Sequence, residues 1–126
     1  MFLMIRNLAL FVLYNKEGKI LMQHRTDDAP RFPGLWGFFG GGIEQGESPK
    51  QALLREIKEE LNLVVSNPQL ILTTDFKDDV YEGKRYVFKG QYYGEPLELL
   101  EGQAMKWCTV LELKALKVSP HKSYCR

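Results

Sequence analysis

Three glutamates, Glu56, Glu59 and Glu60, lie within five residues in a stretch that is amphipathic at helical spacing. At about 100° per residue, the apolar side chains from Leu53 to Leu61 fall on one arc, and Glu60 and Glu56 fall beside it. Carboxylates at the edge of a core are costly in free energy unless a cation neutralises them. Oxygen ligands at i, i+3 and i+4 suit Mg²⁺ or Mn²⁺, and these ions also bind substrate phosphates. The pattern therefore predicts a divalent cation site that acts on phosphate groups.

A solvated charged face is the alternative interpretation of the same run. Arg55 and Glu59 stand four residues apart, so they could form a helical ion pair that contributes about 0.3–0.5 kcal/mol. Glu44 and Glu47, which precede the helix, could compensate its dipole. These acidic residues nevertheless gather at the end of, and directly after, the stretch between residues 34 and 46 that holds six of the eleven glycines. Glycine permits sharp turns and close approach of a ligand to the backbone, so the combination favours a binding site.

The ends of this helix are marked by residues with specific terminal preferences. Ser48 is a candidate N-cap, Pro49 suits the first helical position, and Gln51 stands where a capping box requires Glu or Gln. The helix should run to about Leu61 and stop at Asn62, because asparagine tolerates the left-handed conformation that ends many helices. The carboxylates are therefore expected on a helix that starts directly after the glycine-rich stretch.

Segments rich in β-branched and aromatic residues surround the helix and predict strands. Two hairpins are predicted, one from Leu8–Tyr14 with Lys19–Arg25, the other from Gln69–Phe76 with Lys84–Tyr93 and a turn at Asp78, Asp79, Glu82 and Gly83. The remaining predicted elements are a short strand at Trp36–Phe39 leading into a loop of glycines 40–42, a strand at Ala104–Cys108, a helix at Val110–Leu116 and a solvated basic tail at Lys117–Arg126.

Length and charge limit the classes of protein that this chain can be. At 126 residues with 44% hydrophobic side chains it should form one domain with a substantial core. Its 17 basic and 16 acidic residues give no bulk field for a nucleic-acid polymer or a membrane surface. Cys108 and Cys125 are expected to be reduced thiols in a cytoplasmic setting. The apolar start, Met1 to Tyr14, has the features of a strand rather than those of an export signal or a membrane span.

The acidic helix and the glycines together resemble a known motif. Gly41, Glu47 and the run from Arg55 to Leu63 stand at the spacing of the Nudix box, Gly-x5-Glu-x7-Arg-Glu-U-x-Glu-Glu-x-Gly-U with U aliphatic. Asn62 alone departs from it, at a position where the family usually has glycine. The box covers residues 41–63, about a fifth of the chain. The resemblance implies that residues 1–126 form a MutT-like Nudix hydrolase domain, an α/β/α sandwich with a mixed β-sheet.

The resemblance also implies an activity. Nudix hydrolases cleave a phosphoanhydride bond in a nucleoside diphosphate linked to another group, with Mg²⁺ or Mn²⁺ as the cofactor. The compact length is similar to that of MutT-type enzymes, which convert nucleoside triphosphates to monophosphates and pyrophosphate. Hydrolysis of diadenosine polyphosphates or nucleotide sugars, and a catalytically silent nucleotide-binding module, are the alternatives. The partner is expected to be a nucleotide derivative, bound to a monomer or a homodimer.

Roles carry over to this chain by position in the box. The catalytic set implied is Glu56, Glu59 and Arg55, with Glu56 as the favoured base and Arg55 orienting carboxylates. The metal set implied is Gly40 through its carbonyl, Glu47, Glu56, Glu59 and Glu60. Glu47 could equally act outside the ligand shell.

Substrate contacts must come from outside the box. Arg25 ends a predicted strand that leads towards the glycines, where it could contact phosphate or base. Several aromatic residues could stack on a base, although aromatics at strand spacing usually belong to a core. Phe39, next to the glycines, and Tyr81 are the candidates taken forward. Tyr81 lies 18 residues beyond Leu63, a spacing similar to that of a tyrosine in the diadenosine polyphosphate hydrolases.

Overall fold

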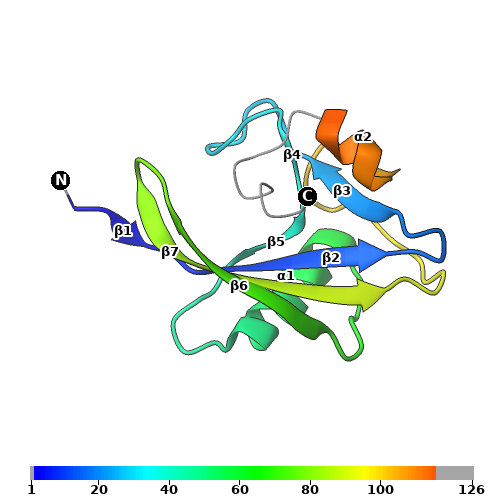
Figure 1. Cartoon of the computed structure of the whole chain (residues 1–126), viewed down its shortest axis with the longest axis horizontal. Coiled ribbons are helices and arrows are strands. Elements are labelled where there is room, and N and C mark those ends of the chain that lie inside the picture. Colours follow the sequence, from blue (N-terminus) through cyan, green and yellow to red (C-terminus); the bar gives the residue numbers. More distant parts are fainter. Residues whose placement is uncertain (1, 116–126) are drawn as a thin grey trace.

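One mixed β-sheet forms the centre of the protein. The computed structural model describes residues 2–115, in which eight strands join in one sheet (Figure 1). The strands are β1 (Met4–Ile5), β2 (Leu8–Tyr14), β3 (Ile20–His24), β4 (Trp36–Gly37), β5 (Phe39–Gly42), β6 (Gln69–Lys77), β7 (Tyr81–Gln91) and β8 (Ala104–Cys108). Two helices accompany them, α1 (Pro49–Leu61) and α2 (Val110–Ala115). Within residues 2–115, neither helix is long and apolar enough to cross a membrane.

Strand β2 is the axis of the sheet. It runs parallel to β7 from Leu8 opposite Arg85 to Tyr14 opposite Gln91, and Figure 1 shows the two strands side by side. On its other side β2 is antiparallel to β5 and to β3. Strands β4 and β8 both pair with β3, and β6 pairs with β7.

The side chains of β2 divide the core into two parts. Ala9 and Phe11 pack in one buried cluster together with the apolar face of α1. Leu8 and Leu10 pack in a second cluster that includes Leu113 of α2. Because successive side chains of a strand point to opposite faces, the two clusters cover the two faces of the sheet. The predicted α/β/α sandwich with a mixed sheet is confirmed.

Both predicted hairpins are present, and the second has a tighter turn than the sequence suggested. Residues 81–83 were expected in the turn but belong to β7, where Gly83 pairs with Phe76. A Cβ atom at Gly83 would lie 2.1 Å from the carbonyl oxygen of Arg6. The glycine therefore serves close pairing with β1, which lies parallel to β7, rather than the turn.

The glycines after Trp36 form a strand rather than the predicted loop. The run Trp36–Phe39 divides between β4, which pairs with β3, and β5, which continues through Gly42 and pairs with β2. Gly40 has φ +131°, and a Cβ atom there would lie 2.1 Å from the Ala9 carbonyl oxygen. Only glycine allows β5 to approach β2 this closely.

Helix α1 has the predicted bounds and caps. The Ser48 hydroxyl accepts from the Gln51 N–H at 3.1 Å, and the Gln51 side chain accepts from the Ser48 N–H at 2.8 Å. Asn62 has φ 52° and ψ 34°, and its N–H donates to the Lys58 carbonyl at 3.0 Å. The family departure at residue 62 thus keeps the left-handed cap.

At the C-terminal end of the chain, β8 has its predicted bounds, and Cys108 at the end of β8 is a buried free thiol. The end of the predicted last helix at Leu116, the basic tail and Cys125 lie outside the described residues.

The cap at Asn62 gives a direct test of the helix end. Asn62→Ala should lower the free energy of unfolding by about 1–2 kcal/mol, because alanine is strained at φ 52°. Asn62→Gly should lower the free energy of unfolding by less than Asn62→Ala does, since glycine adopts this conformation freely. Urea denaturation of the three proteins measures both values, and an equal loss in both variants would contradict a conformational role.

Candidate functional site

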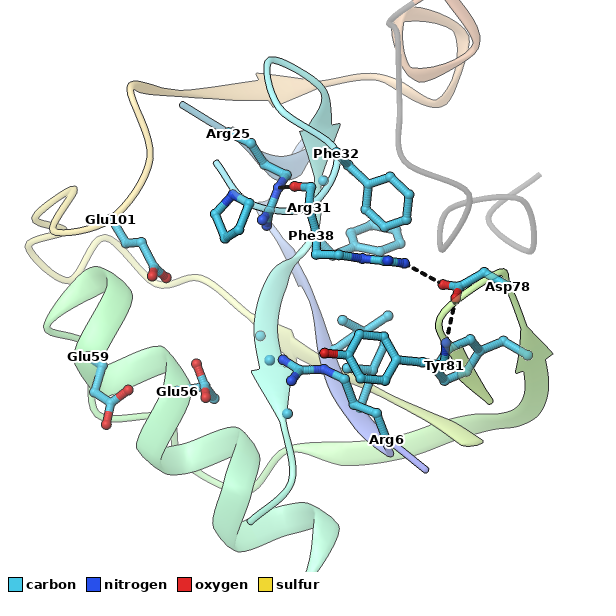
Figure 2. A pocket seen from close by; sticks show the side chains of 18 residues that line it. Arg6, Arg25, Arg31, Phe32, Phe38, Glu56, Glu59, Asp78, Tyr81 and Glu101 are labelled. Carbon is cyan, nitrogen blue, oxygen red and sulfur yellow. Dashed lines mark hydrogen bonds and ion pairs between the residues drawn. The ribbon is translucent and has the colours of Figure 1, made fainter. Parts of the chain in front are cut away.

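A cavity of about 570 Å³ opens between α1, β5 and the turn that joins β6 to β7 (Figure 2). Figure 2 shows Glu56, Glu59 and Glu101 on one side of it, and arginines with aromatic rings on the other. Residues of the glycine strand β5 lie between the two sides. A cavity of this size is typical of sites for small organic ligands. We call its two sides the carboxylate wall (Glu56, Glu59 and Glu101, which line the cavity, with Glu60 buried behind them) and the arginine wall (Arg6, Arg25 and Arg31).

Glu60 is the most deeply buried member of the carboxylate wall. It is 3% exposed, and one of its oxygens accepts from the Gly40 N–H at 2.8 Å. Burial, and next a hydrogen bond with Glu101, raise the pKa of Glu60 to about 10, although the Gly40 N–H acts in the opposite direction. The buried carboxyl group of Glu60 thus meets the carboxyl group of the solvent-exposed Glu101, and burial disfavours the charged form of Glu60.

Glu56 faces the cavity beside Gly41. A Cβ atom at Gly41 would lie 2.6 Å from the carboxyl carbon of Glu56, so any side chain there would displace the carboxylate. Burial raises the pKa of Glu56, while its bond to Arg55 acts in the opposite direction. Glu59 lines the outer part of the cavity, and its side chain is largely exposed.

Arg55 holds the acidic residues from behind the cavity, which it does not line. It donates to both oxygens of Glu47 at 2.8 and 2.9 Å, to Glu56 at 2.8 Å and to the Gly42 carbonyl at 3.0 Å. The guanidinium lowers the pKa of Glu47 to about 2, and these bonds raise the pKa of Arg55 itself. Charge-assisted bonds of this kind fix the orientation of carboxylates. Glu47, like Arg55, does not line the cavity.

The donors on the carboxylate wall suit a hard divalent cation. All the side-chain donors there are carboxylate oxygens, and neither the buried Glu60 nor the exposed Glu101 forms an ion pair with a basic side chain in residues 2–115. Among residues 2–115, no three His, Cys, Asp or Glu side chains are grouped closely enough to enclose a metal ion by themselves. The donor set therefore fits a cation such as Mg²⁺ that completes its coordination with water and substrate oxygens.

Glu101 belongs to this wall, and the sequence analysis missed it. Its carbonyl oxygen accepts from the side chain of the buried Gln23 at 2.9 Å. Gly102 follows with φ +95°, and a Cβ atom there would lie 2.8 Å from Gln23. A Glu-Gly pair just before a predicted strand was a signal in the sequence. The pairing of β8 with β3 that brings this pair to the site is a long-range contact that local patterns do not specify.

The predicted substrate residues fall in different places. Arg25 and Tyr81 line the cavity. Phe39 does not, because it is 1% exposed and packs in the core cluster with α1. The prediction of a substrate contact at Phe39 is therefore corrected. Phe38, its neighbour, points to the other face of the sheet and lines the cavity instead.

Asp78 organises the arginine wall, and sequence analysis had placed it only in a turn. One oxygen accepts from the N–H groups of Val80 and Tyr81 at 2.8 and 2.7 Å. The other forms an ion pair of 2.6 Å with Arg31, which lies 5.2 Å from the centre of the Tyr81 ring and 5.0 Å from that of Phe32. Asp78 thus joins the loop after β3 to the β6–β7 turn (Figure 2).

A family comparison accounts for this combination of fold and site. The family model described as NUDIX domain matches residues 4–125. The chain belongs to the NUDIX domain family. The membership predicted from the spacing of Gly41, Glu47 and the Arg55–Leu63 run is thereby confirmed.

Curated relatives and solved structures agree with this membership. The chain is 42% identical over 72 residues to the nucleoside triphosphatase NudI of Escherichia coli, an alignment that covers 54% of this NUDIX chain and 48% of the relative. The chain thus spans about half the length of the curated relatives it matches. The MutT protein of Methanosarcina mazei has a TM-score of 0.83 at 19% identity, covering 96% of this chain and 88% of the other.

A further solved structure contains a ligand. The NUDIX domain of Shewanella oneidensis NrtR, crystallised with ADP ribose, has a TM-score of 0.74 at 20% identity, covering 94% of this chain and 80% of the other. At these identities both solved structures show the shared fold.

The burial of Glu60 predicts how stability depends on pH. Because its folded pKa lies above that of a free carboxyl, the stabilisation from its bound proton is complete at low pH and is lost as the pH rises towards 10. Without metal, Glu60→Gln should therefore exceed wild type in free energy of unfolding by about 1 kcal/mol or more at pH 9. The difference in free energy of unfolding between Glu60→Gln and wild type should be smaller at pH 5. Urea denaturation in the presence of a chelator measures this difference, and the exposed Glu59→Gln is the control. A difference that does not change with pH would contradict a buried, protonated Glu60.

The ion pair between Asp78 and Arg31 predicts a modest loss of stability when the charge of Asp78 is removed. Asp78→Asn keeps an acceptor for the turn but removes the charge that holds Arg31, so it should lower the free energy of unfolding by about 1 kcal/mol. Asp75→Asn, in the same hairpin, breaks a more exposed pair with Lys84 and should change almost nothing. Equal losses in the two variants, measured by urea denaturation, would argue against an organising role for Asp78.

Proposed function

We propose that this chain is a divalent-cation-dependent hydrolase, with Mg²⁺ as the first candidate ion, that cleaves a phosphoanhydride bond of a nucleoside triphosphate. The observation that carries the proposal is the cavity with carboxylates on one wall and arginines on the other. Such a cavity suits a polyphosphate, whose oxygens can bind a cation on one side and guanidinium groups on the other. The name of the relative NudI, a nucleoside triphosphatase, favours the same substrate class.

Glu56, Glu60 and Glu101 are the side chains that we propose hold the cation, with Glu59 and the Gly40 carbonyl assisting at the edges of the group. When bound, the cation supplies positive charge to the phosphate oxygens as the bond to the leaving phosphate breaks. Glu60 anchors the group, because its hydrogen bond from Gly40 fixes it against β5. Glu47 is assigned a supporting role, since both of its oxygens are engaged by Arg55.

Glu56 is the side chain that we propose as the general base. It faces the cavity, and Arg55 holds one of its oxygens so that the carboxylate keeps a fixed direction. Water attacks one phosphorus of the anhydride, its proton passes to Glu56, and the bond from that phosphorus to the bridging oxygen breaks. The released phosphate or pyrophosphate takes the electron pair of that bond. Arg55 acts through the carboxylates, which makes it a positioning residue.

A nucleotide-binding module without catalysis is the second candidate, favoured by the NrtR structure with ADP ribose. The two candidates differ in what the carboxylates are for. A binding module has no need of a base beside the attacked phosphorus, whereas the hydrolase does.

Turnover tests the proposed function directly. Release of phosphate or pyrophosphate is measured with nucleoside triphosphates, diadenosine polyphosphates and nucleotide sugars, with and without Mg²⁺. Glu56→Gln should lower kcat by about 10²–10⁴-fold, the usual contribution of a general base. The exposed Glu17→Gln, far from the cavity along the chain, is the matched control and should keep full activity. Binding of nucleotides without any turnover would support the silent module instead.

Cation dependence is a separate prediction. Addition of Mg²⁺ to the chelator-treated protein should raise its Tm, since a cation that binds only the folded state stabilises it. Glu60→Gln should reduce that rise strongly, because it removes the buried carboxylate that meets Glu101. The Glu17→Gln control should behave as wild type. An unchanged Mg²⁺ response in Glu60→Gln would place the ion elsewhere.

A further inference from the structure

Two guanidinium groups on the arginine wall have no charged partner in residues 2–115. Arg31 is paired with Asp78, but no ion pair joins Arg6 or Arg25 to a carboxylate within that part of the chain. Arg25 uses its Nε to donate to the Arg31 carbonyl at 2.8 Å, which holds its stem and leaves the end of the guanidinium towards the cavity. The wall therefore offers two fixed positive charges opposite the carboxylates.

Arg6 lines the cavity and is exposed to solvent, and three neighbours hold it in place. Its N–H donates to the Glu82 carbonyl at 3.0 Å, which anchors the backbone between β1 and β2. Its guanidinium lies across Gly42, where a Cβ atom would be 3.0 Å from one of its nitrogens. The same guanidinium lies 5.5 Å from the centre of the Tyr81 ring. Such a preorganised guanidinium needs little further ordering to bind an anion.

The ring of Tyr81 contacts two guanidinium groups of the arginine wall. The guanidinium groups of Arg6 and Arg31 lie over its ring at 5.5 and 5.2 Å, and Figure 2 shows the three side chains together. Its ring is thus a platform for cations, which explains a tyrosine here without a stacked base. The sequence analysis named Tyr81 as a substrate contact, and it did not single out Arg6.

We propose that Arg6, with Arg25, binds a phosphate group of the substrate that lies beyond the group attacked at the carboxylate wall. This rests on the proposed function and narrows its substrate class. A nucleoside triphosphate carries an additional anionic phosphate, whose oxygens can accept hydrogen bonds from a guanidinium group in bidentate fashion. The uncharged sugar of a nucleotide sugar offers only hydroxyl groups there. The arginine wall therefore selects for the length of the phosphate chain rather than for the base.

The experiment compares Arg6→Gln and Arg6→Lys with a control, Arg85→Gln. Arg85 also lies over an aromatic ring, that of Phe76 at 5.0 Å, but it does not line the cavity. For nucleoside triphosphates, Arg6→Gln should raise KM about tenfold with kcat changed little, as expected when one charge-assisted contact is lost. The factor should be the same for a purine and a pyrimidine, and should shrink at high salt. Arg6→Lys should recover part of the loss, and nucleotide sugars should be affected little.

Three results would overturn the proposal. An active wild type whose Arg6→Gln variant keeps the same KM shows that Arg6 does not bind substrate. A loss that differs between bases assigns Arg6 to recognition of the base. The third result concerns a wild type that turns over none of the substrates, in which case the proposed function fails. The arginine wall is then tested by calorimetry of inorganic tripolyphosphate binding with Mg²⁺ present. Arg6→Gln should bind tripolyphosphate about tenfold more weakly than Arg85→Gln, and equal affinities would reject the anion site.

Discussion

The close contact between α1 and the glycine strand β5 is the constraint on which the site depends. Three consecutive glycines meet three charged residues of one helix: the Gly40 N–H binds Glu60, Gly41 lies against Glu56, and the Gly42 carbonyl accepts from Arg55. The contact at Gly41 needs a backbone without a side chain, because a Cβ atom there would overlap the Glu56 carboxylate. On its other edge β5 pairs with β2, so the sheet core and the carboxylates share one strand.

That contact also sets the electrostatics of the carboxylate wall. Apolar residues of α1 draw the helix into the core, and Glu60 is carried inward with them. Arg55 then compensates the outer acidic residues Glu47 and Glu56, but it forms no ion pair with Glu60. Neither the buried Glu60 nor the exposed Glu101 forms an ion pair with a basic side chain in residues 2–115, so a cation would be stabilised where these two carboxyl groups meet. The arginine wall has the opposite charge: Arg6 and Arg25 form no ion pair with a carboxylate in residues 2–115.

Features that depend on neighbouring residues were predicted from the sequence, whereas features that depend on contacts between distant segments were not. Helix α1 was predicted from Ser48 to Asn62 because its caps and its apolar arc are local signals. The desolvation of Glu60 was predicted for the same reason, since the helical period alone places it beside the core. Phe39 was assigned wrongly because its role depends on which face of β5 meets α1, a choice that the run of aromatic residues does not reveal. The turn at Asp78 was placed, but its bond to Arg31, 47 residues away, was not.

The sequence by itself determined the family, the helix and the acidic residues of the Nudix box, because the box is a continuous pattern in which spacing and chemistry coincide. The tertiary structure alone decided which further side chains complete the cavity. Glu101 arrives through the pairing of β8 with β3, and Arg6 through the pairing of β1 with β7. Each of these contacts joins segments more than seventy residues apart. Such contacts arise from the packing of the whole sheet, so no local window of the sequence contains them.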